Sequence, residues 1–353
     1  MKKRISAVLL ACALLLGVAA GCAANTQKSE TKSEAKSEAS GDAATKDSAG
    51  TSEKTKITFV LDWTPNTNHT GLYVAQEKGY FDAAGLEVEI VQPPEDGAEM
   101  LVGSGKAQFG VSFQDSMLPA VAGEGKVPIE AVAALVQHNT SGIISLKGNG
   151  MDKPKGLEGK TYATWDLPIE KATLKTVVEK DGGDFSKVKL IPSTVTDEVS
   201  ALQSKQVDAI WVFYGWAGVA TEVAGLETDY FAFKDIDPVF DYYTPVVVGN
   251  IDWMQQNSTQ TMRFLSALKQ GYEFAIDNPD EAADILLKAA PELDSKLVKA
   301  SQQYLSKQYK ADVEQWGYID PKRWNAFYNW INENNLFEEK IAENTGFTND
   351  YLV

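Results

Sequence analysis

Residues 56–81 read KITFVLDWTPNTNHTGLYVAQEKGYF, and this stretch predicts the repeating unit of the fold. Residues 56–61 are strand formers, and residues 62–69 form a loop that is rich in turn residues. A helix is expected over residues 71–78, and Gly79 ends it. A strand, a loop and a helix in this order are typical of an α/β protein.

The same alternation continues along most of the chain. It predicts an α/β fold with mainly parallel sheets flanked by helices, followed by a helical C-terminal region. We expect further strands at residues 86–92, 109–112, 129–136, 161–164, 187–191, 209–212 and 246–250, and helices at 98–104, 114–122, 168–181, 199–205, 258–277, 279–289, 293–302 and 320–335.

The size of the folded part favours two lobes, because about 300 residues exceed what one hydrophobic core usually holds. The strand at residues 246–250 returns the chain to the first lobe. We therefore expect lobe 1 at residues 56–144 and 246–353 and lobe 2 at residues 145–245, with crossings near residues 142–144 and 244–246.

The N-terminus has the layout of a bacterial lipoprotein signal. Residues 1–4 are basic, residues 5–18 are small or apolar, and Ala19-Ala20-Gly21 precedes Cys22. We expect cleavage before Cys22 and lipidation of its thiol. A transmembrane anchor is the alternative, but the apolar run is shorter than the roughly 20 residues that a spanning helix needs. Residues 23–55 lack aromatic and branched aliphatic side chains and are predicted to be a flexible tether.

Charge and cysteine usage exclude several classes of protein. The net charge is −16; residues 1–4 contribute +3 and residues 23–55 contribute −1, so residues 56–353 carry −18. Such an acidic body is a poor binder of nucleic acid, which requires Lys and Arg contacts to phosphate. Both cysteines, Cys12 and Cys22, lie in the signal, so the body has no disulfide, thiol nucleophile or cysteine metal site. We expect neither a metal nor a cofactor.

Aromatic and polar residues follow several predicted strands and are the candidate ligand contacts. Open α/β sheets bind ligands at the carboxyl ends of their strands, and aromatic side chains with amides and carboxylates beside them suit a planar, polar ring. The simpler interpretations are that each Trp caps the core, that Asp62 and Asn66 cap a helix, that His69 is structural, and that Gln114 or Asp115 starts a helix. Candidates on these grounds are Asp62, Trp63, Asn66, Gln114, Trp165, Tyr214 and Trp216.

Three segments resemble the family of substrate-binding proteins and enzymes built around the thiamine pyrimidine precursor. The most specific is residues 62–75, followed by Lys78-Gly79-Tyr80-Phe81. Residues 102–111 and 278–286 fit the wider superfamily, which includes ABC-transporter receptors for sulfonates, nitrate and taurine. The resemblance covers about residues 56–340 and is strongest to the formylaminopyrimidine-binding (ThiY-like) lipoproteins.

The resemblance implies a two-lobed type II periplasmic-binding-protein fold that closes around its ligand. It implies that Trp63 stacks on a pyrimidine ring, with Asp62, Asn66 and His69 nearby. From the other lobe, it implies that the ring is met by Tyr214 and Trp216, with Glu222 as a polar partner.

The signal and the resemblance together predict a monomeric, lipid-anchored receptor outside the cytoplasm. It would bind formylaminopyrimidine or hydroxymethylpyrimidine and deliver it to an ABC permease with its ATPase. A riboflavin or sulfonate receptor of the same fold is one alternative, although a sulfonate site would be expected to use Arg, Lys or helix N-termini. A pyrimidine-synthesis enzyme is the other alternative, but the enzymes of the family carry a cysteine-rich iron-binding motif that this body lacks.

Overall fold

Two five-stranded sheets form the framework of the chain in the computed structural model, which describes residues 53–193 and 195–353. The predicted signal, the lipidation site Cys22 and residues 23–52 of the predicted tether lie outside the described residues. Within the described ranges, no helix is both long enough and apolar enough to span a membrane.

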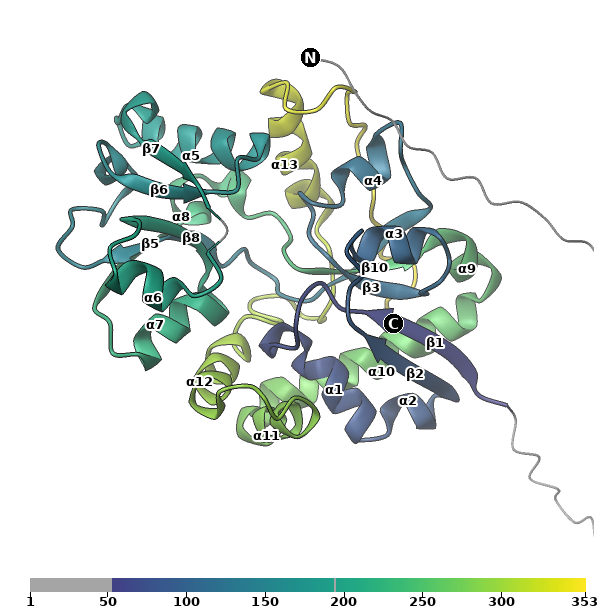
Figure 1. Cartoon of the computed structure of the whole chain (residues 1–353). Helices are drawn as coiled ribbons and strands as arrows, with labels where there is room; N and C mark the ends of the chain where they lie inside the picture. Colours follow the sequence, from purple (N-terminus) through teal and green to yellow (C-terminus); the bar gives the residue numbers. More distant parts are fainter. Residues whose placement is uncertain (1–52, 194) are drawn as a thin grey trace, which may run out of the picture. The chain divides into compact units, whose positions relative to one another are not determined.

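The first sheet contains the strand that opens the fold and the strand that returns the chain to it (Figure 1). β1 is parallel to both of its neighbours, whereas β10 is antiparallel to both of its own. The side chains of β3 and β10 are all buried, because helices cover both faces of the sheet. The order of the strands is β2 (Leu86–Val91), β1 (Thr55–Val60), β3 (Phe109–Ser112), β10 (Val246–Asn250) and β4 (Ile129–Ala134).

The second sheet has the same mixture of directions. β6 is parallel to β7 and β8, and β5 is antiparallel to β8 and β9. The expectation of mainly parallel sheets is therefore confirmed, with the addition that each sheet carries one strand, β10 or β5, that runs against its neighbours. The order of the strands is β7 (Lys189–Pro192), β6 (Thr161–Thr164), β8 (Ala209–Phe213), β5 (Ser141–Leu146) and β9 (Thr228–Ala232).

The chain passes between the two sheets in two segments. The first is residues 135–140, because β5 already belongs to the second sheet and includes residues 142–144. The second runs from the end of β9 to Val246 and contains two short helices, α8 (Phe233–Ile236) and η5 (Pro238–Phe240). We call residues 135–140 the first crossing segment and the last part of the second connection, residues 241–245, the second crossing segment.

The helices begin and end close to where the sequence predicts them. The predictions at residues 258–277 and 279–289 are confirmed to the residue as α10 and α11, whereas the helix expected at 114–122 begins only at Leu118. Together with α8, the α-helices of the described residues are α1 (Thr70–Glu77), α2 (Tyr80–Ala83), α3 (Ala98–Gly103), α4 (Leu118–Ala122), α5 (Pro168–Lys180), α6 (Glu198–Gln203), α7 (Val219–Val223), α9 (Ile251–Gln256), α10 (Ser258–Asp277), α11 (Pro279–Ala289), α12 (Ser295–Leu305) and α13 (Pro321–Glu333).

Close packing of α1 on α10 sets the position of the loop that follows β1. A Cβ atom at Gly71 would lie 2.4 Å from the ring of Tyr272, and one at Gly271 would lie 2.0 Å from the carbonyl oxygen of Gly71. Only glycine permits this approach of the two helices. The Tyr272 hydroxyl donates a hydrogen bond of 2.6 Å to the carbonyl oxygen of Asn68, which ties the loop to α10.

The aromatic side chains of α13 belong to the core, as their helical spacing predicts. Trp324, Phe327 and Tyr328 are almost completely buried. Phe327 stacks on Tyr242 of the second crossing segment with ring centroids 4.0 Å apart. The C-terminal helix therefore packs directly against the residues that join the two sheets.

Candidate ligand-binding site

The carboxyl ends of four strands face one another between the two sheets. In the first sheet, β1 and β3 are parallel neighbours and lead into Trp63 and Phe113. In the second sheet, β6 and β8 are parallel neighbours and lead into Trp165 and end at Phe213. The rings of Phe113 and Phe213 stack with centroids 5.9 Å apart and an interplanar angle of 18°. This contact shows that the two groups of strand ends meet, which is the place where α/β sheets bind ligands.

A buried histidine holds the carboxylate at the end of β1. His69 Nε2 lies 2.6 Å from Asp62 Oδ1, and His69 Nδ1 accepts a hydrogen bond from the backbone N–H of Asn66. Because Nδ1 is an acceptor, the proton of a neutral ring is on Nε2, which donates to Asp62. The His69 side chain is fully buried, so its observed role is to orient Asp62.

Asn66 is occupied by the backbone of its own loop. Its side-chain oxygen accepts the N–H of Asn68, which caps the short helix η1 (Thr67–His69), and its amide donates to the carbonyl oxygen of Thr64. Trp63 is the opposite case, since 61% of its surface is exposed. The group that this loop presents to a ligand is therefore the indole of Trp63, beside the partly buried carboxylate of Asp62.

Tyr214 and Glu222 form a pair just after the carboxyl end of β8, the central strand of the second sheet. The Tyr214 hydroxyl donates to the Glu222 carboxylate, and the ring packs between Tyr230 and Tyr304 at centroid distances of 4.6 and 5.3 Å. Burial first, and then the Glu222 carboxylate, raise the pKa of the Tyr214 hydroxyl, which therefore stays protonated at neutral pH. Trp216 packs against the apolar faces of α11 and α12.

Helix α12 contacts both the loop after β1, which carries Trp63, and the turn after β8, which carries Tyr214. Ser301 donates to the carbonyl oxygen of Gly215 in the π-helical turn η4 (Tyr214–Gly218). The same hydroxyl lies 2.5 Å from the Thr67 hydroxyl of η1. One side chain of α12 thus joins the loop after β1 to the turn after β8.

A cavity of about 570 Å³ opens beside the stacked phenylalanines. Trp165, which is 43% exposed, lies on its wall and packs on Trp211 at a centroid distance of 5.8 Å. The cavity is lined by five aromatic residues, by two carboxylates and by smaller side chains: Phe113, Trp165, Trp211, Phe213, Phe337, Asp115, Glu170, Ser116, Leu118, Pro119, Leu167, Pro168, Ile169 and Leu336.

Gln114 is not in this cavity. Its side chain is completely buried, donates to the carbonyl oxygen of Trp324 and accepts the backbone N–H of Tyr243. Its neighbours Phe113 and Asp115 line the cavity instead. The signal that marks Trp63 and Trp165, an aromatic residue at the end of a strand, also marks Phe113.

Glu170 is a structural carboxylate on the cavity wall. One oxygen accepts hydrogen bonds from the Tyr162 hydroxyl and the Trp165 N–H, and the other accepts from the Thr164 hydroxyl and the Leu167 N–H. With both oxygens doubly occupied, Glu170 shapes the loop after β6 and thereby positions Trp165.

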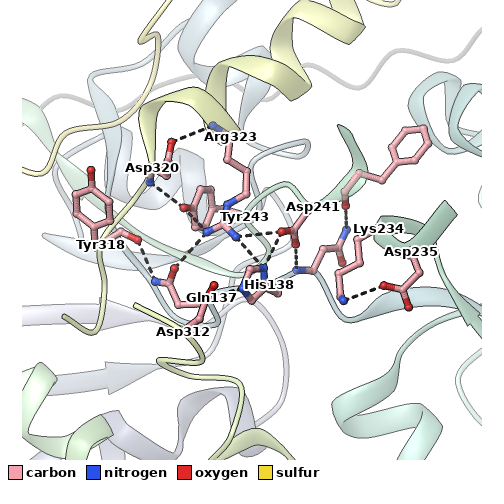
Figure 2. Close-up of polar contacts among 12 residues, drawn as sticks. Gln137, His138, Lys234, Asp235, Asp241, Tyr243, Asp312, Tyr318, Asp320 and Arg323 are labelled. Atoms are coloured by element: carbon pink, nitrogen blue, oxygen red, sulfur yellow. Dashed lines mark hydrogen bonds and ion pairs between the residues drawn. The ribbon is translucent and has the colours of Figure 1, made fainter. Parts of the chain in front are cut away.

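A charged network joins the two crossing segments to the start of α13 (Figure 2). Asp241 Oδ2 lies 2.6 Å from His138 Nδ1 and 3.1 Å from Arg323 Nη1, and Asp241 Oδ1 accepts the N–H of Asn139. His138 Nε2 lies 2.9 Å from Asp312. Because both ring nitrogens face carboxylates, the hydrogen bond to Asp241 above all raises the pKa of His138.

The described residues contain no group of three or more His, Cys, Asp or Glu side chains that could hold a metal ion. The candidate site therefore consists of aromatic faces, hydroxyls and carboxylates. Such groups can stack on a planar ring and accept hydrogen bonds from its N–H groups.

Comparison with known proteins places these features in a family. The sequence pattern of a family described as "NMT1/THI5 like" matches residues 66–282, which is more than half of the chain. A formylaminopyrimidine-binding protein of Halalkalibacterium halodurans is 27% identical over 295 residues, which cover 82% of this chain and 88% of that protein. A 4-amino-5-hydroxymethyl-2-methylpyrimidine phosphate synthase of Saccharomyces cerevisiae is 24% identical over 303 residues, which cover 78% of this chain and 80% of that protein.

Solved structures show the same fold. The alkanesulfonate-binding protein SsuA of Xanthomonas axonopodis pv. citri superposes with a TM-score of 0.62 at 12% identity, covering 83% of this chain and 97% of that protein. At this identity the likeness concerns the fold alone. The predicted periplasmic-binding-protein fold and the resemblance to the thiamine-pyrimidine family are both confirmed.

Proposed function

We propose, because this chain belongs to the NMT1/THI5-like family, that it is a binding protein for a pyrimidine precursor of thiamine. The observation that carries the proposal is the placement of exposed or half-exposed aromatic side chains at four strand ends of the two sheets. Phe113, Trp165 and Phe213 line the cavity, and Trp63 lies at the end of β1 and is not among the lining residues. Flat apolar faces of this kind suit a neutral heteroaromatic ring.

The polar groups at these strand ends match the edges of such a ring. The carboxylate of Asp62, oriented by His69, can accept an N–H of the ligand, while the indole of Trp63 covers a ring face. Tyr214, Trp216 and Glu222 approach from the second sheet, and Asn66 keeps the loop in place. In this proposal the ligand lies between the two sheets, and the lobes built on them close over it.

The charged side chains that line the cavity favour a neutral or cationic ligand over an anion. The side chains that line it include two carboxylates, and no Lys, Arg or His is among them. A sulfonate or nitrate would face these carboxylates without a compensating cation, which is unfavourable at short range. The fold shared with alkanesulfonate-binding proteins therefore does not bring their ligand with it.

Membrane attachment and transport complete the proposal. Lipidation at Cys22 would hold the receptor at the outer face of the cell membrane, with residues 23–55 as a tether. The ligand would then be delivered to an ABC permease and its ATPase by a monomeric receptor that carries no cofactor.

A thermal-shift and calorimetry panel tests the function. The purified chain is titrated with formylaminopyrimidine, hydroxymethylpyrimidine, thiamine, riboflavin, taurine and nitrate. A ligand that binds only the folded state at 100 times its Kd stabilises it by about 2.7 kcal/mol, which gives a clear rise in Tm. A response to a pyrimidine without turnover supports the proposal. A response to riboflavin or taurine alone replaces the ligand, and conversion of the pyrimidine to a product would make the chain an enzyme.

A further inference from the structure

Asp115 is the residue at the end of β3 whose carboxyl group reaches the cavity. Residues 113, 114 and 115 follow the strand directly, and the chain turns the first and third toward the cavity and the second into the core. Gln114 is fully hydrogen-bonded to backbone groups in the core. The polar contact that the sequence assigns to position 114 is therefore available at position 115.

The Asp115 carboxyl has free acceptor capacity. Within the described residues, the one side chain that donates to it is Tyr242, whose hydroxyl lies 3.4 Å from Oδ2. Burial raises the pKa of Asp115 to about 6, against the lowering effect of nearby backbone N–H groups. A half-buried carboxyl with such weak pairing is costly to maintain unless a ligand satisfies it.

The other carboxylate of the cavity cannot take this role. Glu170 already accepts four hydrogen bonds, two on each oxygen. Of the two carboxylates, Asp115 is therefore the one that remains available to an N–H donor in the cavity, whose lining also includes Phe113, Phe213 and Trp165.

We propose that Asp115 is a specificity-determining residue that accepts the exocyclic amine of an aminopyrimidine. The aromatic walls cover the faces of the ring, and the carboxyl group reads the N–H edge. This inference rests on the proposed function and adds to it the group that separates amine-bearing rings from rings without an amine.

The chemistry of the cavity supports a hydrogen-bond donor such as an amine rather than an anion. Aromatic faces attract a cationic or strongly polarised N–H group, and a carboxylate accepts from it, whereas both repel negative charge. The volume of about 570 Å³ is ample for one heterocycle, since small-molecule sites have about 300–1,000 Å³.

Calorimetry on the full chain tests the inference with formylaminopyrimidine and with an analogue in which hydrogen replaces the ring amine. The wild-type chain should bind the amine-bearing ligand about 10- to 100-fold more tightly than the analogue, the effect of leaving one buried acceptor unpaired. Affinity for the amine-bearing ligand should fall in Asp115→Asn, which can still accept one N–H through its amide oxygen, and fall by a similar factor in Asp115→Ala, which has no side-chain acceptor. In Asp115→Ala the preference over the analogue should largely disappear.

Asp166→Asn is the matched control. Asp166 follows Trp165 directly, pairs with Lys171 at 2.9 Å, does not line the cavity and has a φ of 64°, a conformation that asparagine tolerates. This variant should bind both ligands as the wild type does. The comparison of the two ligands on the wild-type chain needs no variant, so equal affinities would overturn the inference even if neither Asp115 variant folds.

The outcomes separate the inference from the function on which it rests. If the wild type binds the pyrimidine but does not prefer the amine-bearing form, or if Asp115→Ala keeps that preference, Asp115 does not read the amine and the proposed function stands. If the wild type binds no pyrimidine, both the proposed function and the role of Asp115 are overturned.

Discussion

Replacing Asp241 by asparagine should weaken the junction between the two sheets. Asp241 accepts hydrogen bonds from Arg323, from His138 and from the backbone N–H of Asn139. Asparagine keeps the shape and can still accept the backbone N–H. It loses the charge, and its amide group cannot accept from two cationic partners.

The size of the effect follows from burial. The side chain of Asp241 is 17% exposed, and so is that of Arg323, so water compensates for only part of the loss. A hydrogen bond to a charged group contributes about 1.5–3 kcal/mol, and two are removed while solvent regains partial access. We expect the free energy of unfolding to fall by about 2–4 kcal/mol, which lowers Tm by about 5–10 °C in a protein of this size.

Asp312→Asn is the matched control, because Asp312 contacts the other ring nitrogen of the same His138. Its side chain is 75% exposed, and exposed ion pairs contribute about 0–1 kcal/mol. Urea unfolding and calorimetry of both variants at pH 6 measure the difference. Equal losses in the two variants, or a loss below about 1 kcal/mol for Asp241→Asn, would refute the assignment of the stabilisation to the buried carboxylate.

Three further predictions concern the pH dependence, the site and the helix packing. The folded pKa of His138 is raised, so its contribution to the free energy of unfolding is complete below the unfolded pKa of about 6.5 and is lost as pH rises through the folded pKa. The stability difference between wild type and His138→Gln should therefore shrink from pH 6 to pH 9 in urea titrations. A difference that grows over this range would contradict the sign. Trp63→Ala should weaken ligand binding by about 1–3 kcal/mol, the contribution of one stacked base, with unchanged Tm of the free protein; an unchanged Kd in calorimetry would remove Trp63 from the site. Gly71→Ala should destabilise the fold by about 1–3 kcal/mol, because its Cβ would lie 2.4 Å from Tyr272; thermal unfolding like that of the wild type would show that α1 and α10 can separate freely.

Local sequence predicts the elements better than it predicts their directions. The strands β3, β6 and β10 are confirmed with the expected bounds, because each is a short run of strand formers between turn signals. The insertion of β10 between β3 and β4, antiparallel to both, depends on where the chain re-enters the sheet. No residue of β10 records that direction, so the sequence predicts the mainly parallel sheets but not the one antiparallel strand in each.

The charged network was beyond the reach of local patterns for a related reason. His138 and Arg323 are 185 residues apart, and each is an ordinary polar residue in its own segment. Their contact exists because α13 packs against the second crossing segment, through Phe327 and Tyr242. Prediction of the network would have required the packing of α13, which the helical spacing of its aromatic residues marks as buried without naming its partner.

The two interpretations of the loop after β1 are not alternatives. His69 is structural, as the simpler interpretation holds, since it is fully buried and bonded to Asn66 and Asp62. Yet the hydrogen bond that makes His69 structural is also what fixes the carboxylate of Asp62 at a strand end. A fixed acceptor loses less conformational entropy on binding than a mobile one, so we expect His69 to contribute to affinity through Asp62. His69→Gln should therefore weaken binding although the side chain of His69 is fully buried, and calorimetry should show the loss disappearing when Asp62 is already Asn.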